Sequence, residues 1–257
     1  MTATCPELLG FREVAGLRTV DGGRIRPGLL YRSGTPQFLD LPTARRLVRD
    51  TGIRSTIDLR LPHEVAQEGR GPLDALGIGH VPHPVRVGAL VAAGSAVAPM
   101  PGDDPIVQTY LRYLDDGAEE IVGVLPDLLR PGTVPTLVHC TVGKDRTGVV
   151  VALVLAAVGV RRDDIVADYV AGAADVGPAM ERLRRMASYG DAVDVYPPAT
   201  WVVEAEAMRR FLDAVDERHG GVCPFLHANG VPPTIVEELT EVLVEHPPDP
   251  RAAEELP

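Results

Sequence analysis

A short segment near the middle of the chain carries residue types suited to nucleophilic chemistry on an anion. It reads His-Cys-Thr-Val-Gly-Lys-Asp-Arg-Thr-Gly over residues 139–148. Five residues separate Cys140 from Arg146, so the thiol can lie beneath a bound anion while the guanidinium holds two of its oxygens. Cationic surroundings favour the thiolate, which is the reactive form of cysteine.

The flanking elements suggest why this segment would bind phosphate. Residues 134–139 read as a buried strand and Thr147–Val158 as an apolar helix, so the loop between them points backbone N–H groups and a helix N-terminus at one place. Gly143 permits the tight turn, and Gly148 allows the helix to pack closely on the sheet. The predicted phosphate-binding residues are Thr141, Val142, Gly143, Lys144 and Arg146.

A thiolate beneath a bound phosphoryl group is placed for in-line attack, which gives a phosphocysteine intermediate. The hydroxyl of Thr147 can then hydrogen-bond the departing thiolate in the second step. This chemistry needs no cofactor. We also expect no metal site, because His80 and His83 have no acidic or cysteine partner at ligand spacing.

Composition limits the function classes. The chain has 257 residues, 45% of them hydrophobic, and a net charge of −11. The apolar fraction excludes a fully disordered chain, and the acidic balance excludes nucleic-acid binding through bulk positive charge. We expect one domain over residues 1–257, with a frayed acidic tail at 246–257.

Three widely spaced cysteines do not suggest a disulfide framework, and residues 1–10 carry no recognisable secretory signal. The longest near-apolar run, Val149–Val160, is too short to cross a bilayer, so no stable membrane insertion is expected. We therefore expect a cytoplasmic protein, with export by a route without a signal peptide left open.

The elements that must position the loop alternate between strands and helices. Strands are expected at 29–32, 53–59 and 134–139, and at 78–85 on an edge or in a loop because of Pro82 and Pro84. Helices are expected at 42–50 (ending at Gly52), 106–114 and 119–129 (parted by Gly117), 147–158, from a cap at Asp163 or Asp164 through Tyr169, at 178–186, at 201–215, and from a capping box at Thr234–Glu237. Residues 87–105 read as a long loop. The fold class predicted is α/β, with a mainly parallel central sheet flanked by helices and an added helical lid layer.

The central segment resembles the signature loop of the protein-tyrosine-phosphatase superfamily, Cys-x5-Arg-Ser/Thr. Its fuller form is similar to that of the bacterial atypical tyrosine and lipid phosphatases of the mycobacterial PtpB type. The likeness extends to Phe11–Val14, to Gly22–Ser33, to Ile57–Arg60 with Glu64, and to Asp164–Tyr169, so that it covers about residues 10–245. It departs at Ala171–Ala174, where small residues replace a more polar stretch.

The resemblance implies roles for two further loop residues. Asp145 would be the general acid that protonates the leaving oxygen. Asp103 or Asp104 is the rival acid, because other branches of the superfamily carry a mobile acid loop at about that distance, although either residue could simply cap a helix. Lys144, which is the only lysine of the chain, would widen the substrate range towards multiply charged phosphates, whereas by itself it could be a solvated surface residue.

Supporting roles are expected for two neighbours of the loop. Asp58 ends a strand on the side where the strand ends should line the pocket, so it would orient Arg146 or the loop, or merely form a turn. His139 should face away from the phosphate, as neighbours on a strand do, and help hold the surroundings of Cys140. The arginines that follow the catalytic helix could guide anions or form part of a lid, or lie on solvated faces: Arg161, Arg162, Arg182, Arg184 and Arg185.

Three functions remain in competition at this point. The first is a cysteine-dependent phosphatase acting on phosphotyrosine, and also on phosphoserine, phosphothreonine or phosphoinositides. The second is the same chemistry on a small phosphorylated metabolite, which the few aromatic residues favour. The third is a phosphate-binding module without turnover. The expected partner in the first two is a phosphorylated protein, lipid or small molecule.

Overall fold

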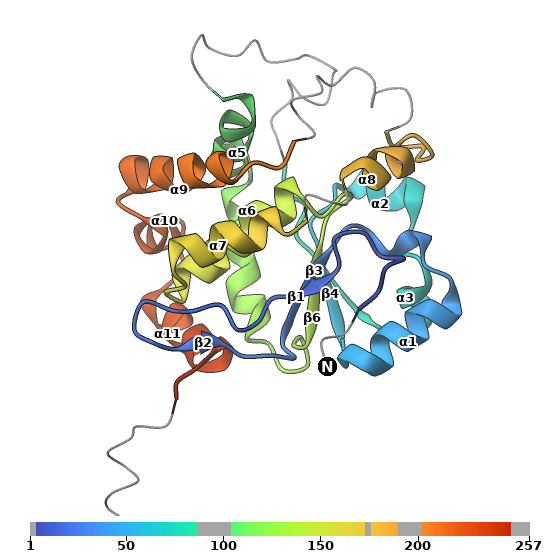
Figure 1. Ribbon diagram of the computed structural model, residues 1–257, viewed down its shortest axis with the longest axis horizontal. Coiled ribbons are helices and arrows are strands. Elements are labelled where there is room, and N and C mark those ends of the chain that lie inside the picture. Colours follow the sequence, from blue (N-terminus) through green and yellow to red (C-terminus); the bar gives the residue numbers. More distant parts are fainter. Residues whose placement is uncertain (1–3, 87–103, 173–175, 190–201, 248–257) are drawn as a thin grey trace, which may run out of the picture.

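A five-stranded sheet forms the centre of the fold (Figure 1). The computed structural model describes residues 4–86, 104–172, 176–189 and 202–247. The strands of this sheet are β1 (Arg12–Glu13), β3 (Leu30–Ser33), β6 (Thr136–His139), β4 (Ser55–Asp58) and β5 (Gly79–Pro82), in that spatial order. All neighbours pair in parallel except β1, which runs antiparallel to β3. The mainly parallel α/β fold is therefore confirmed.

The register of the strands brings three chain segments to one edge of the sheet. Ser33 of β3 and Asp58 of β4 are both paired with His139 of β6. The carboxyl ends of these parallel strands are therefore level. In open α/β sheets this edge is where ligands bind.

Helices cover both faces of the sheet, and further helices form a separate layer (Figure 1). Their bounds are η1 (Pro36–Phe38), α1 (Leu41–Thr51), α2 (Pro62–Glu68), α3 (Pro72–Ala75), α5 (Pro105–Leu128), α6 (Asp145–Ala157), α7 (Arg162–Val170), α8 (Val176–Leu183), α9 (Ala205–His219), α10 (Val222–Ala228) and α11 (Pro233–Leu243). None of these helices is both long and apolar enough to cross a bilayer.

Successive side chains of a strand point to opposite faces of the sheet, so one sheet contributes to two hydrophobic cores. Leu137 packs with Tyr31 and the apolar residues of α1 and α3, whereas its neighbour Val138 packs with those of α5, α6 and α7. The larger core continues through α9, α10 and α11, with α9 packed on α5 and α7. This outer group of helices is the added helical layer that the sequence predicts.

A small two-stranded ribbon ties the beginning of the chain to its end. β2 (Arg24–Ile25) pairs antiparallel with β7 (Val244–Glu245). Just after β7, His246 lies 3.0 Å from Asp21 through Nε2 and Oδ2, so the first residue of the expected tail has a partner. The rest of that tail, from residue 248, lies outside the described residues, as do residues 87–103 of the expected long loop and Trp201.

Several local signals are confirmed. Gly52 ends α1 with φ +68°, in the left-handed region that favours glycine. Gly117 has φ −129° and ψ 23° and breaks the regular geometry of α5, which explains the two expected helices. β5 lies at the edge of the sheet, where its proline is tolerated. Asp104 is the N-cap of α5, because its Oδ1 accepts the Ile106 N–H at 2.9 Å.

Two expected helix caps are wrong. α7 begins at Arg162 with Arg161 as its N-cap, so Asp163 and Asp164 lie in the first turn. The carboxylate of Asp164 is instead bound by Arg18, whose Nη2 lies 2.7 Å from Oδ1. α11 begins at Pro233, whose fixed φ suits the first helical position, and Thr234 therefore lies inside the helix rather than capping it.

Truncating Phe211 tests whether the helical layer and the sheet form one cooperative unit. Phe211 is fully buried on α9, with its ring 5.8 Å from that of Tyr110 on α5. We expect Phe211→Ala to lower the free energy of unfolding by about 3–5 kcal/mol in a single denaturant transition, because a large core side chain is lost. The exposed Arg209→Ala on the same helix should stay within about 0.5 kcal/mol of the unsubstituted protein. Two transitions, of which only one shifts, would contradict the single domain.

Candidate active site

The predicted phosphate-binding loop lies between β6 and α6 and rests on the end of β3. The Thr35 N–H donates to the Thr141 carbonyl at 3.0 Å, which holds the loop against the segment that follows β3. Gly143 has φ +81°, and a Cβ built on it would lie 2.4 Å from the backbone N of Gly34. Only glycine fits this turn and this close approach.

Cys140 lies at the base of the loop. Its side chain is buried, and its Sγ accepts the Gly143 N–H at 3.2 Å. A backbone donor aimed at the sulfur is what the cradle predicts. Thr147 is fully buried in the first turn of α6, and within the described residues its Oγ1 has no hydrogen-bond partner. A buried hydroxyl without a partner is costly, so its proton is available to a group that forms during the reaction.

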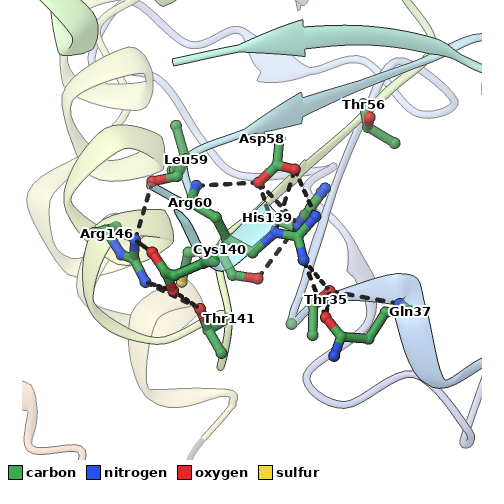
Figure 2. A network of polar contacts seen from close by, with 12 residues as sticks. Thr35, Gln37, Thr56, Asp58, Leu59, Arg60, His139, Cys140, Thr141 and Arg146 are labelled. Atoms are coloured by element: carbon green, nitrogen blue, oxygen red, sulfur yellow. Dashed lines mark hydrogen bonds and ion pairs between the residues drawn. The ribbon is translucent and has the colours of Figure 1, made fainter. Parts of the chain in front are cut away.

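Arg146 is held by a carboxylate that the sequence reading did not assign. Glu64, on α2, binds the guanidinium with both oxygens, at 2.6 Å to Nη1 and 2.9 Å to Nη2. Leu59 O and Thr141 Oγ1 accept further bonds from Nη1 and Nη2, at 3.2 Å and 3.0 Å (Figure 2). Nε takes part in none of these bonds. The guanidinium is thereby fixed in one plane with its Nε–H left for an oxyanion, and bidentate binding would also require Nη2 to exchange the Thr141 hydroxyl for a phosphate oxygen.

Burial and charge act against each other in this pair. Burial raises the pKa of Glu64, but the charge and hydrogen bonds of Arg146 outweigh it and bring that pKa down to about 2. Burial likewise lowers the pKa of Arg146, and the Glu64 carboxylate more than compensates. Both groups therefore stay ionised, as a buried pair must if it is to stay together.

Asp58 does not orient Arg146, which corrects one expectation. Its carboxylate binds Arg60 instead, with Oδ2 2.7 Å from Nη2 (Figure 2). It also lies 3.2 Å from His80 Nε2. Burial raises the pKa of Asp58, but the neighbouring His139, His80 and Arg60 outweigh this and lower it below the ordinary range. β4 ends at Asp58. The chain then continues into α2, and Glu64 of this helix binds Arg146, which is the role expected for Asp58.

Arg60 connects this pair to the segments that hold the loop. Its Nη1 donates to Thr35 Oγ1 at 3.1 Å and to Gln37 Oε1 at 3.0 Å (Figure 2). It also donates to the Gly69 carbonyl at 3.1 Å. Gly69 ends α2, so Arg60 fastens the helix that carries Glu64. Arg60 enters the sequence analysis only as part of the family resemblance. No pattern of neighbouring residues predicts that an arginine will be fully buried.

His139 is buried as expected and lies beneath the loop. Its Nδ1 is 3.3 Å from the Cys140 carbonyl and 3.8 Å from Asp58 Oδ1. Burial lowers the pKa of His139 to about 4, with the Asp58 carboxylate acting in the opposite direction. A neutral imidazole at this place supports the backbone of Cys140.

The loop's own carboxylate and ammonium lie together. Lys144 is buried, so its interpretation as a solvated surface lysine is wrong, and its Nζ lies 3.3 Å from Asp145 Oδ1. The Asp145 side chain is about one-third exposed. Of the rival acids, Asp104 has its carboxylate engaged as the α5 cap, and Asp103 falls outside the described residues.

A second buried arginine braces the loop from the opposite side. Arg32 on β3 donates from Nη2 to the Gly143 carbonyl at 3.1 Å and from Nη1 to Asp168 Oδ2 at 2.6 Å. Arg12 binds the other oxygen of Asp168 at 3.0 Å through Nε. The only sequence signal for this brace is an arginine inside an otherwise buried strand, and the sequence reading gave it no role.

Residues 176–189, here called the cover segment, pack on the loop. Leu183 and Met186 form an apolar cluster with Val142 of the loop. Tyr189 donates to Glu64 Oε1 at 2.7 Å and accepts from Arg146 Nη2 at 3.1 Å. Val142 is thus an apolar contact of the loop as well as a source of backbone N–H.

The arginines that could guide anions, belong to a lid or lie on solvated faces have other partners. Arg182 lies over the Phe38 ring at 5.5 Å, and Arg162 binds Asp213 and Asp216 of α9. Arg184 and Arg185 lie near Glu181, at 3.7 Å and 3.5 Å. Among the residues that the structure places, no group of three or more His, Cys, Asp or Glu side chains is arranged to hold a metal ion. Cys5, Cys140 and Cys223 are all free thiols.

Comparisons with known proteins agree with the geometry. The profile of the tyrosine phosphatase family matches residues 4–245. The triple specificity protein phosphatase PtpB of Mycobacterium tuberculosis is 30% identical over 93% of this chain and 98% of its own length. A putative tyrosine-protein phosphatase of Cupriavidus necator is 32% identical over 84% of this chain and 79% of its own.

Among solved structures, the core catalytic domain of the PP-IP phosphatase SIW14 from S. cerevisiae matches with a TM-score of 0.40. It is 18% identical and covers 66% of this chain and 79% of that chain. A second structure of the same catalytic core matches with a TM-score of 0.43 at 14% identity, over 81% and 86% of the two chains.

Removing the charge of Glu64 should weaken both the site and its resistance to acid. We expect Glu64→Gln to lower kcat/KM about 10–100-fold, because charge-assisted bonds that fix Arg146 are lost. Since folding lowers the pKa of Glu64 from 4.5 to about 2, the carboxylate stabilises the folded protein above pH 4.5, and this stabilisation disappears as the pH falls towards 2. The free energy of unfolding, measured in urea between pH 6 and pH 2, should therefore decrease less with falling pH for Glu64→Gln than for the unsubstituted protein.

Glu68→Gln is the matched control, since Glu68 lies one turn further along α2 and binds Gln37 and Ser188 instead of Arg146. If both variants lost kcat/KM equally, the loss could not be assigned to the bonds between Glu64 and Arg146.

Proposed function

Since this chain belongs to the tyrosine phosphatase family, we propose that it hydrolyses phosphate monoesters with Cys140 as the nucleophile. The proposed substrates are phosphotyrosine and, beyond it, phosphoserine, phosphothreonine and phosphoinositides. The observation that carries the proposal is the pairing of Cys140 and Arg146 on one loop, with a backbone N–H aimed at the sulfur and the guanidinium fixed by Glu64.

The first step forms a covalent intermediate. The phosphate binds to the N–H groups of residues 141–146 and to the Arg146 guanidinium. The Cys140 thiolate attacks phosphorus, an S–P bond forms, and the P–O bond to the leaving group breaks. Asp145 gives its proton to the leaving oxygen, which departs as an alcohol or phenol.

The second step releases phosphate. A water molecule attacks the phosphorus of phosphocysteine and gives a proton to the Asp145 carboxylate, while the S–P bond breaks. The hydroxyl of Thr147 donates to the departing thiolate, a role supported by the lack of any hydrogen-bond partner for its Oγ1 among the described residues. Inorganic phosphate leaves, and Asp145 has regained the proton that it needs for the next cycle.

The surroundings of the loop bear on substrate choice. The buried Lys144 ammonium adds a positive charge beside the cradle, and this supports a substrate with more than one phosphate group. The M. tuberculosis relative is itself called a triple specificity phosphatase. We propose a cytoplasmic location as well, which the three free thiols support.

Replacing the nucleophile tests the mechanism and the substrate class together. Phosphate release by the unsubstituted protein and by Cys140→Ser is compared on a phosphotyrosine peptide, a phosphoserine peptide, phosphoinositide vesicles, and nucleotide and sugar monophosphates. We expect turnover to vanish in Cys140→Ser while binding of inorganic phosphate, followed as a rise in melting temperature, is retained. Activity that persists in this variant would contradict the covalent mechanism. If only a sugar or nucleotide monophosphate is turned over quickly, the proposed protein and lipid substrates are wrong and the substrate is a small metabolite.

Arg146→Lys tests the cradle separately. An ammonium cannot bind two oxygens in one plane, nor can it keep both bonds to Glu64. We expect kcat/KM to fall at least about 100-fold, since several charge-assisted hydrogen bonds are lost. A rate close to that of the unsubstituted protein would mean that Arg146 does not hold the phosphate.

A further inference from the structure

Two buried tyrosines from different helices end against the carboxylate of Asp145. Tyr110 of α5 donates its hydroxyl proton to Asp145 Oδ1 at 2.8 Å, and the hydroxyl of Tyr169 of α7 lies 2.7 Å from that of Tyr110. Tyr110 is fully buried and Tyr169 is 3% exposed. Tyr110 therefore lies between two polar partners in an otherwise apolar core.

The direction of the two hydrogen bonds follows from the number of protons. Burial raises the pKa of Tyr110 well above its ordinary value, and the negative charge of Asp145 adds to this. The pKa of Tyr169 is raised for the same two reasons. Both phenols thus keep their single proton. Because Tyr110 gives its proton to the carboxylate, Tyr169 must be the donor in the bond between the hydroxyls.

The two oxygens of Asp145 are treated differently. Oδ1 accepts from Tyr110 and lies 3.3 Å from the Lys144 ammonium. No described residue hydrogen-bonds Oδ2. A carboxyl group that is anchored through one oxygen in this way presents the other at a fixed position, which is what a proton donor to a leaving group requires.

Gly148 makes room for this arrangement. A Cβ on Gly148 would lie 3.0 Å from Cδ2 and Cε2 of the Tyr169 ring, which is tighter than an ordinary contact. The glycine that was expected to bring α6 close to the sheet lies 3.7 Å from Arg32 Nη2 of β3 by this measure, and it also brings α6 close to α7. A larger residue there would require the Tyr169 ring to shift by a few tenths of an ångström.

We propose that Tyr110 and Tyr169 are positioning residues that hold Asp145 by Oδ1, so that Oδ2 carries the proton to the leaving oxygen. The inference rests on the proposed role of Asp145 as the general acid. The two hydroxyls do not touch the substrate. They act through Asp145, and Tyr169 acts through Tyr110.

The dependence of the rate on the leaving group separates this role from a merely structural one. The leaving phenol of p-nitrophenyl phosphate is acidic and departs with little help from an acid. The phenol of phenyl phosphate has a pKa of about 10, like tyrosine, and needs a proton as it departs. The measured quantity is kcat/KM, which reports the steps up to formation of phosphocysteine. A loss of folding would lower it equally for both substrates.

Four variants make the comparison. We expect Asp145→Asn to lose about 100-fold or more on phenyl phosphate and far less on p-nitrophenyl phosphate. Tyr110→Phe should show the same pattern with a loss of about tenfold, the effect of one hydrogen bond to a charged group. Tyr169→Phe should lower kcat/KM on phenyl phosphate about two- to threefold, and less on p-nitrophenyl phosphate. Tyr31→Phe is the control, because it removes a buried hydroxyl that lies 3.5 Å from the Thr51 carbonyl in the other core.

Gly148→Ala provides an independent test that leaves both hydroxyls in the chain. Alanine favours the helix, so α6 should remain folded, but the Tyr169 ring must shift by a few tenths of an ångström to admit the methyl group. We expect the same dependence on the leaving group as in Tyr169→Phe. The melting temperature of each variant shows that it is folded.

The possible failures can be distinguished. If Asp145→Asn shows the leaving-group dependence and Tyr110→Phe loses equally on both substrates, or on neither, the positioning role is overturned and Asp145 remains the acid. If Asp145→Asn itself shows no dependence, the acid assignment and the positioning role fall together. The covalent mechanism is tested by Cys140→Ser, and none of these outcomes affects it.

Discussion

The buried ion pair between Glu64 and Arg146 is the interaction on which the site depends. A guanidinium cannot be kept in an apolar interior without a counter-charge, and the carboxylate of the loop itself, Asp145, lies against Lys144 instead. Helix α2 brings Glu64 to it, and Arg60 fastens the end of that helix to the segment after β3. Sheet edge, helix and loop are therefore joined by charges that would each be unstable alone.

A second buried arginine shows the same principle from the other side of the loop. Arg32 is neutralised by Asp168 of α7 through Nη1 and donates from Nη2 to the Gly143 carbonyl. The loop is thus held from β4–α2 on one side and from β3–α7 on the other. Groups fixed in this way need little reorganisation when charge develops on a bound phosphate, which is the form of stabilisation that contributes most to many enzymes.

Prediction from sequence succeeded mostly where the determinant is local, although two of the expected helix caps were wrong. The turn at Gly143, the helix end at Gly52 and the cap at Asp104 each depend on a few neighbouring residues. It failed where the partner is distant. Glu64 and Asp58 are both carboxylates near one strand end, and only the path of α2 decides which of them reaches Arg146, 82 residues away. The same reason explains why no role was predicted for Arg32, Tyr110 and Tyr169. A hydrophobic pattern does not predict that a polar side chain will be buried unless its distant partner is known.

The division of labour within the fold follows from where the chemistry lies. The proposed nucleophile, arginine, acid and hydroxyl donor all fall between Cys140 and Thr147, so their mutual geometry is set by one turn and the start of one helix. The remaining elements can then vary without disturbing the reaction, provided that they keep Glu64, Arg32 and the carboxylate of Asp145 in place. Substrate choice in such an arrangement falls to what surrounds the loop. In the proposed function that is the buried Lys144 of the loop itself, together with the cover segment, which packs on Val142 and reaches Arg146 through Tyr189.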